Sequence, residues 1–142
     1  MIKNFWLRFQ ASRALARLLR RLSTVDGVEA EALANCAEDS ESEAILLAHA
    51  ALQWMDDDPK HSAQLYGRVL SMKGREGSNT IEYLQRFARY NLAIRRRNWG
   101  EAKQACRLAR KQRVTGSLRL RFPLIDLPRG FDQPDPISFV TS

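Results

Sequence analysis

The residues that could do chemistry are few. His49 and His61 are the only two histidines among 142 residues, and Cys36 and Cys106 are the only two cysteines. The cysteines form no CxxC pair and the histidines no HExxH sequence, so the usual spacings of metal ligands are absent. His49 lies within the apolar stretch AILLAHAAL, where a buried, hydrogen-bonded histidine is expected. The sequence therefore predicts no metal site, and free thiols of this kind are typical of a reducing compartment such as the cytoplasm.

The acidic run Asp56–Asp58 stands directly before Pro59. This position favours a turn between two helices with Asp58 as the cap of the second, because proline is well tolerated at the first helical position. The run lacks the alternating ligands of a calcium loop. The chain also contains no phosphate-binding glycine loop and no GxSxG sequence, which are the other common signs of a catalytic site. We therefore expect a non-enzymatic protein with no catalytic residues and no cofactor.

Charge divides the chain into three parts that sum to a net +7. Residues 1–24 carry six basic residues and no acid, residues 25–60 carry ten acids and one lysine, and residues 61–142 carry sixteen basic residues and six acids. Apolar residues make up 44% of the chain, as in ordinary globular proteins. The pattern suggests charges that meet within the fold or on a partner rather than a uniform polycation.

Helix start signals repeat along the first 113 residues. A capping residue followed three positions later by glutamate occurs at Asp26, Ser40, Asn79 and Asn98, and each such pair can satisfy free backbone N–H groups at a helix start. The sequence predicts helices over residues 3–22, 27–38, 41–55, 59–73, 80–96 and 99–113, and thus an all-α fold.

Two helical hairpins within this region are similar to each other. A shift of 39 residues places Ser40 on Asn79 and Ala63 on Ala102, which predicts a duplicated hairpin over about residues 40–73 and 79–113. Chance similarity between amphipathic helices is the alternative. The same shift places Arg95–Arg97 on Asp56–Asp58, so we expect these two turns to face each other in a stack.

The second hairpin resembles a tetratricopeptide repeat. The matching stretch is NWGEAKQACRLA, in which the repeat-like residues are Trp99, Glu101, Ala102, Cys106 and Ala109. The stretches YNLA and DDPKHSAQLYGRVL add weaker similarity, with a period of 39 residues rather than about 34. The resemblance covers about residues 40–113. It implies stacked antiparallel helical hairpins with a concave surface that binds proteins or peptides. We expect one helical domain over residues 1–116 with the role of an adaptor or scaffold.

The first helices of the hairpins are expected to line that surface. Tyr83, Phe87 and Tyr90 are the predicted partner-binding side chains, with Arg86 and Arg89 as polar neighbours. A basic stripe on the next helix offers a surface for an acidic partner; its members at 100° per residue are Lys103, Arg107, Arg110 and Lys111. The same stripe suggests nucleic-acid binding as an alternative, although no aromatic residue lies between Trp99 and Phe122 to stack on bases.

The two ends of the chain differ from the middle. On the basic N-terminal helix, Phe5, Trp6 and Phe9 point away from a leucine seam. We expect both faces to pack within the protein or a dimer. Contact of the aromatic residues with a partner or an anionic membrane surface, or an organelle-targeting peptide, is the alternative. Near the C-terminus, SLRLRF alternates apolar and basic residues, which favours a strand or extended segment. Four prolines follow, so residues 117–142 are predicted to be an extended segment outside the helical domain.

Overall fold

The computed structural model describes residues 15–72 and 78–124, and every regular element within these two ranges is helical. Residues 15–21 are helical and lead into a short 3-10 helix, η1 (Leu22–Thr24). The later elements are α2 (Gly27–Asn35), α3 (Ser40–Trp54), α4 (Pro59–Ser71), α5 (Asn79–Arg95), α6 (Trp99–Arg110) and α7 (Gly116–Arg121). The predicted all-α class is therefore confirmed for the described residues.

Side-chain caps begin α2 and α6 at the predicted residues. Asp26 accepts a hydrogen bond of 2.8 Å from the backbone N–H of Glu29. Asn98 accepts one of 3.2 Å from the N–H of Glu101, and its amide nitrogen donates to the Glu101 carboxylate over 3.0 Å. These bonds satisfy N–H groups that the first helical turn leaves free. The local sequence thus determines where both helices begin.

At three further helices the caps are at, or one residue before, the predicted position. Asp58 caps α4 as expected. Asp39 caps α3 in place of Ser40, and Ser78 caps α5 in place of Asn79. Both starts contain two adjacent residues able to cap. The three-residue spacing to glutamate selects the second of each pair, whereas the structure uses the first.

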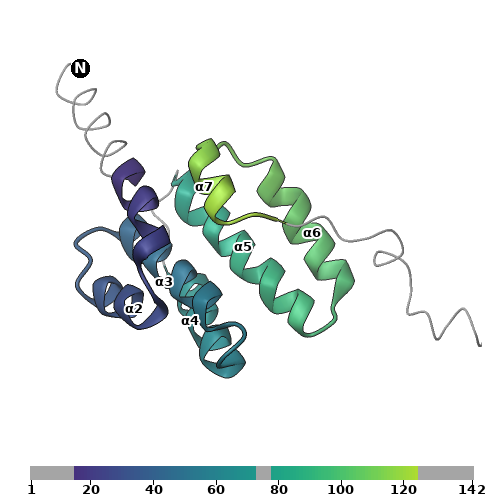
Figure 1. The fold of residues 1–142 in the computed structure, drawn as a ribbon. Coiled ribbons are helices and arrows are strands. Elements are labelled where there is room, and N and C mark those ends of the chain that lie inside the picture. The colour runs from purple at the N-terminus through teal and green to yellow at the C-terminus, as the bar shows by residue number, and fades with distance from the viewer. Residues whose placement is uncertain (1–14, 73–77, 125–142) are drawn as a thin grey trace, which may run out of the picture.

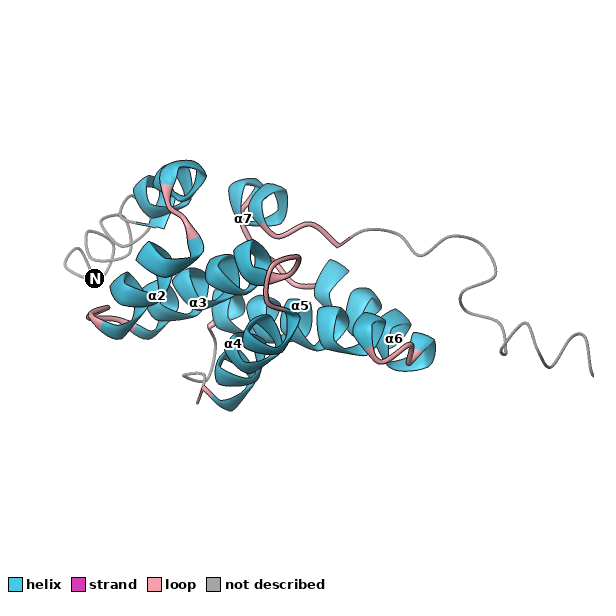
Figure 2. Cartoon of the chain, turned by 60° about the horizontal axis from the view of Figure 1, so that its bottom comes forward, coloured by secondary structure: helices cyan, strands magenta, loops and turns pink. Residues whose placement is uncertain are grey.

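Consecutive helices pack against one another from α2 to α6, and α3 also contacts α5. α2 lies at one side of the array and α6 at the other (Figures 1 and 2). α7 lies over α5, next to α6 (Figure 1). The hydrophobic core follows this array and includes side chains from every one of the described helices.

α3 is the most deeply buried helix. Eight successive residues, from Ala44 to Ala51, are all buried. Four of the eight are alanines besides the large residues Ile45 and Leu47, and small side chains let neighbouring backbones approach closely. The one polar side chain in this run, His49, lies 2.7 Å from the carbonyl oxygen of Val25, so it is buried and hydrogen-bonded, as the sequence predicts.

The prediction of a strand or extended segment after Gly116 is wrong, since residues 116–121 form α7. Thr115 caps this helix by accepting a hydrogen bond from the N–H of Leu118. Leu118 and Phe122 are fully buried, whereas Leu120 is 83% exposed. The buried pair is spaced by four residues, which is one helical turn. Apolar residues at 118, 120 and 122 fit a strand, in which every second side chain is buried, and also a helix, in which 118 and 122 are buried together. The structure shows the helical arrangement. Residues 125–142 lie outside the described residues.

The leucine seam of the N-terminal helix packs on the core where it is described. Leu22 is fully buried, and Leu15 and Leu18 are partly buried against the same cluster. Phe5, Trp6 and Phe9 lie outside the described residues, so their expected packing and the alternative contact with a partner or membrane both stay predictions.

α5 ends with an arginine in a conformation that favours glycine. Arg97 has φ of 56°. Its N–H bonds the carbonyl of Ile94, and the N–H of Asn98 bonds the carbonyl of Ala93 over 2.9 Å. This pair of bonds is the Schellman arrangement, in which the left-handed residue is usually glycine. A side chain there costs about 1 kcal/mol.

We expect Arg97→Gly to raise the free energy of unfolding by about 1 kcal/mol, because it removes the side-chain clash at positive φ. Urea denaturation monitored by circular dichroism measures the change. Arg96→Gly is the matched control: Arg96 has φ of −83°, so glycine there should destabilise by about 0.5 kcal/mol or more. Equal changes in the free energy of unfolding for the two substitutions would contradict the assignment of Arg97 as the strained residue at the end of α5.

Candidate functional site

The candidate chemical residues do not come together as a catalytic or metal site. Within residues 15–72 and 78–124, no group of three or more His, Cys, Asp or Glu side chains is placed to hold a metal ion. Both cysteines are free; Cys36 is exposed and Cys106 is buried. His49 binds a backbone carbonyl within the core. Of these residues, only His61 takes part in a cluster of polar side chains.

His61 joins α2 to α4 through a shared carboxylate. Its Nε2 lies 2.7 Å from one oxygen of Glu31, and the indole N–H of Trp54 donates to the other oxygen over 3.0 Å. The Trp54 and His61 rings pack edge to face with centroids 5.4 Å apart. Gly27 lies so close that an added Cβ would meet Trp54 Nε1 at 2.7 Å. The cluster therefore holds three helices together at short range.

The hydrogen bond to Glu31 raises the pKa of His61 above its ordinary value of 6.5. Burial opposes this change, and the charges of Glu31 and Asp58 add to it. A raised pKa means that the folded state binds the imidazolium form more favourably than the unfolded state does. The strength of this contact therefore depends on pH near neutrality.

The aromatic face predicted to bind a partner is covered by α7. Tyr83 and Phe87 are each 1% exposed. The hydroxyl of Tyr83 donates to the carbonyl of Phe122 over 2.6 Å, and the rings of Phe87 and Phe122 pack edge to face at 5.4 Å. The guanidinium of Arg119 lies 5.4 Å from the centre of the Tyr83 ring. In this conformation the two rings are core residues and are not available to another protein.

The remaining residues of that predicted site also have internal roles or lie at its edge. Tyr90 is 6% exposed and packs in a small cluster with Ala93 and Cys106. Arg86 donates to the carbonyl of Leu108 over 3.1 Å and to the side chain of Gln112, which ties α5 to α6. Arg89 is exposed. The partner surface expected around these five side chains is therefore reduced to Arg89 and the solvent-facing edge of Arg86.

The basic stripe on α6 is exposed as expected. Lys103, Arg107, Arg110 and Lys111 all lie on the solvent side of the helix, while Ala102, Ala105, Cys106 and Ala109 are buried. Arg119 of α7 is not part of this surface, because it donates to the carbonyl oxygens of Arg110 and Gln112 at the end of α6. Such an arginine caps the free carbonyls of the helix. The stripe is thus a surface of α6 itself.

The two charged turns meet through a hydrogen bond from a side chain to a backbone carbonyl. Arg95 donates to the carbonyl of Pro59, one residue after the Asp56–Asp58 run. No ion pair within 4.0 Å joins that run to Arg95–Arg97, although both stretches are described. The predicted register of the α3–α4 and α5–α6 turns is consistent with this contact, but direct pairing of the carboxylates with the guanidiniums is not seen.

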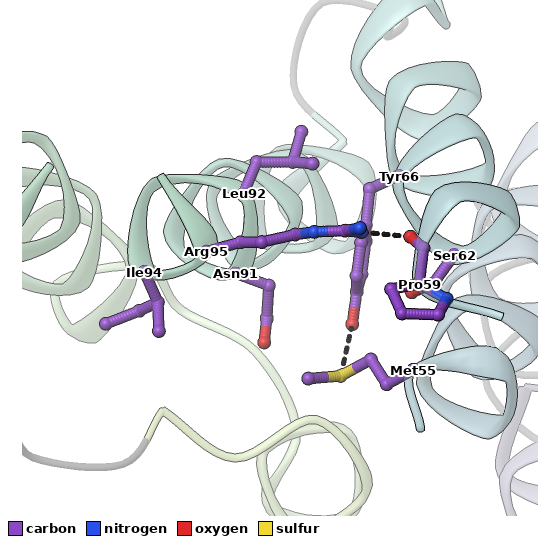
Figure 3. A pocket seen from close by; sticks show the side chains of 8 residues that line it. All are labelled: Met55, Pro59, Ser62, Tyr66, Asn91, Leu92, Ile94 and Arg95. Atoms are coloured by element: carbon purple, nitrogen blue, oxygen red, sulfur yellow. Dashed lines mark hydrogen bonds between the residues drawn. The ribbon is translucent and has the colours of Figure 1, made fainter. Parts of the chain in front are cut away.

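A hollow between α4 and α5 is the clearest candidate for a binding site, and we call it the α4–α5 groove. Its volume is about 220 Å³, and it is lined by Met55, Pro59, Ser62, Tyr66, Asn91, Leu92, Ile94 and Arg95. Figure 3 shows Arg95 reaching across from α5 toward the start of α4, with Tyr66 and Met55 on the far side. Leu92, Ile94 and the 42%-exposed Met55 contribute apolar side chains to the lining of the groove.

Polar groups in the groove are fixed by neighbours. The hydroxyl of Tyr66 donates to the sulfur of Met55 over 3.7 Å, and burial raises the pKa of this hydroxyl above its ordinary range. Ser62 donates to the carbonyl of Ala51 over 2.6 Å. Asn91 donates to the carbonyl of Phe87 over 2.8 Å, and its side-chain oxygen points into the groove (Figure 3). The groove therefore offers an acceptor at Asn91 and a cation at Arg95 beside an apolar surface.

Sequence reasoning did not identify the groove residues as a site. Met55 and Ile94 are apolar residues at helix ends, and they come together only because α4 packs against α5. The one available signal was the equivalence of the Asp56–Asp58 and Arg95–Arg97 turns, since residues of both turns border the groove. No alternation or motif connects the eight lining residues.

The chain matches none of the protein-family models, curated proteins or solved structures with which it was compared. Its tetratricopeptide resemblance therefore stays a resemblance. Among the described residues, no helix combines the length and apolar character needed to span a bilayer.

The contact between His61 and Glu31 predicts a pH-dependent stability. Because the folded pKa of His61 is raised, the stabilisation is complete below the unfolded value of 6.5 and is lost as the pH rises through the folded value. We expect the melting temperature of the wild type to fall between pH 6 and pH 9 by more than that of Glu31→Gln. Thermal unfolding followed by circular dichroism measures both.

Glu29→Gln, on the exposed side of the same helix, is the control and should keep the wild-type pH profile. A Glu31→Gln profile that is parallel to the wild type would show that the contact does not carry the pH dependence.

Proposed function

We propose that this protein is a non-enzymatic interaction module that binds a short segment of a partner protein in the α4–α5 groove. The observation that carries the proposal is the apolar groove itself, with Arg95 and the oxygen of Asn91 at its side. An extended peptide has apolar side chains to place against Met55 and Ile94. It also has backbone N–H and carbonyl groups that suit an acceptor and a cation.

The size of the groove favours a peptide segment over a small-molecule ligand. Pockets for drug-sized ligands and cofactors occupy about 300–1,000 Å³, whereas this groove has about 220 Å³. That volume suits one or two side chains of a partner that continues over the surrounding surface. The groups of the groove do not form a nucleophile and base pair, so we assign it a binding role.

The helical architecture supports the same role. We infer that the hairpins α3–α4 and α5–α6 form a tetratricopeptide-like stack, in which the contact between α3 and α5 joins the first helices of the two units. Stacked hairpins of this kind create extended surfaces that are used to bind other proteins. The adaptor or scaffold role expected from the sequence is therefore retained, with the groove replacing the aromatic face of α5.

Substitution of Met55 by lysine tests the site. Proteins captured by the tagged full chain would be identified by mass spectrometry, and peptides from them would be titrated by fluorescence anisotropy. We expect Met55→Lys to weaken peptide binding by at least about tenfold, because burial of a methionine side chain is worth about 1.5–3 kcal/mol and tenfold corresponds to about 1.4 kcal/mol.

The matched control is Gln53→Lys, which adds the same charge at an exposed position of α3 that does not line the groove. It should change the affinity less than about twofold. Equal affinity of the peptides for wild type and Met55→Lys would show that binding takes place elsewhere.

A further inference from the structure

Opposite charge is concentrated on opposite sides of the molecule. Residues 26–71, which form α2–α4, contain ten acids and two basic residues, whereas residues 79–121, which form α5–α7, contain two acids and twelve basic residues. α2 lies at one side of the helical array and α6 at the other in both views (Figures 1 and 2). The described residues before α2 add Arg17, Arg20 and Arg21, so residues 15–71 carry five more acids than basic residues, whereas residues 79–121 carry ten more basic residues than acids. The described chain is therefore dipolar along the direction in which its helices succeed one another.

The outer face of α2 is both acidic and apolar. This helix buries Gly27, Ala30 and Ala34 on the inside. On the outside, Val28 is 64% exposed and Leu33 is 37% exposed, and Glu29 is exposed between them. Val28 and Leu33 are therefore apolar side chains that the fold leaves in contact with solvent.

The face at the other side, formed by α6 and α7, is basic and carries exposed leucines. Leu108 on α6 is 37% exposed and Leu120 on α7 is 83% exposed. Arg107, directly before Leu108 in the sequence, and Lys111, about one turn after it, are exposed cations. Each outer face thus pairs exposed apolar side chains with one sign of charge, and the two signs are opposite.

End helices of a stacked array normally have a polar outer face, because no further helix covers them. The faces of α2 and of α6–α7 depart from this rule in complementary ways. We propose that a second copy of this chain docks head to tail, with the α2 face of one copy against the α6–α7 face of the next. Val28 and Leu33 would meet Leu108 and Leu120, and Glu29 would meet the cations of α6.

A second copy fits the basic face better than a nucleic acid does. Exposed leucines among the cations have no role against a phosphate backbone, and α6 has no aromatic residue between Trp99 and its end on which a base could stack. The complementary acidic face is present on the same chain. Because the two contacting surfaces differ, the contact is heterologous, and copies add in a row until a ring closes.

Sedimentation velocity of the full chain tests the proposal at about 50 mM and about 500 mM salt, concentrations chosen to change the screening of surface charges. At low salt we expect the weight-average mass to exceed the monomer mass of 16.3 kDa and to rise with protein concentration. At high salt it should fall toward the monomer mass. A monomer at every concentration and both salts would overturn the proposal.

Two double variants distinguish the faces. Val28→Lys with Glu29→Lys changes only the α2 face, and Arg107→Glu with Lys111→Glu changes only the α6 face. Each alone should be monomeric, whereas their equimolar mixture retains one native pair of faces and should reach at least about twice the monomer mass. Asp57→Lys, in the α3–α4 turn, makes the same charge change as Glu29→Lys and should self-associate like the wild type.

All the altered side chains are exposed, so we expect each variant to fold. Circular dichroism verifies this for each one. Continued association of either double variant alone, or a mixture that stays monomeric, would refute the head-to-tail contact. A monomeric wild type that binds duplex DNA or RNA, and loses this binding with Arg107→Glu and Lys111→Glu, would assign the basic face to nucleic acid instead.

Discussion

The rest of the structure depends on one helix that has no solvent-facing side over eight residues. From Ala44 to Ala51, α3 is buried on every side, and it contacts α2, α4 and α5. Burial of its larger side chains is worth about 1.5–3 kcal/mol each. Its backbone and side-chain polar groups must be satisfied within the protein, which explains the bonds from Ser62 to the carbonyl of Ala51 and from His49 to Val25.

The buried position of α3 also determines where charged side chains can lie. With α3 occupying the centre, Asp, Glu, Lys and Arg side chains are kept at the surface, and each of them within the described residues remains at least partly accessible. The contact of His61 with Glu31 lies at the edge of the core for the same reason. Polar contacts with α3 are therefore made by uncharged groups in its buried part, as with Ser62 and the carbonyl of Ala51, and by carboxylates only at its ends, as where Trp54 donates to Glu31.

Local sequence was sufficient to predict the helices from α2 to α6, because each begins at a capping residue with its own chemistry. It was insufficient for α7, whose six residues fit two periodicities and whose cap, Thr115, has no glutamate three positions later. This single error affected the predicted site. Tyr83 and Phe87 were expected on the surface because the helix that covers them was not foreseen.

The groove and the His61–Glu31–Trp54 cluster were beyond local reasoning for a different reason. His61 and Glu31 are 30 residues apart, and the groove takes its walls from the end of α3, from α4 and from α5. Such sites are set by how helices cross, and that geometry depends on the sum of many side-chain volumes. The sequence gives the volume of each side chain, but it does not show how the side chains pack together in space.

The position of α7 affects how the protein folds during its synthesis. Translation delivers the N-terminal helices first, and most helix contacts in the array join neighbours in sequence, so folding can proceed as the chain emerges. A nascent chain that ends with α6 still leaves the Tyr83 and Phe87 rings uncovered and lacks Arg119 at the end of α6. The last described helix therefore completes the core. Before it is synthesised, the exposed aromatic rings can bind chaperones or cause aggregation.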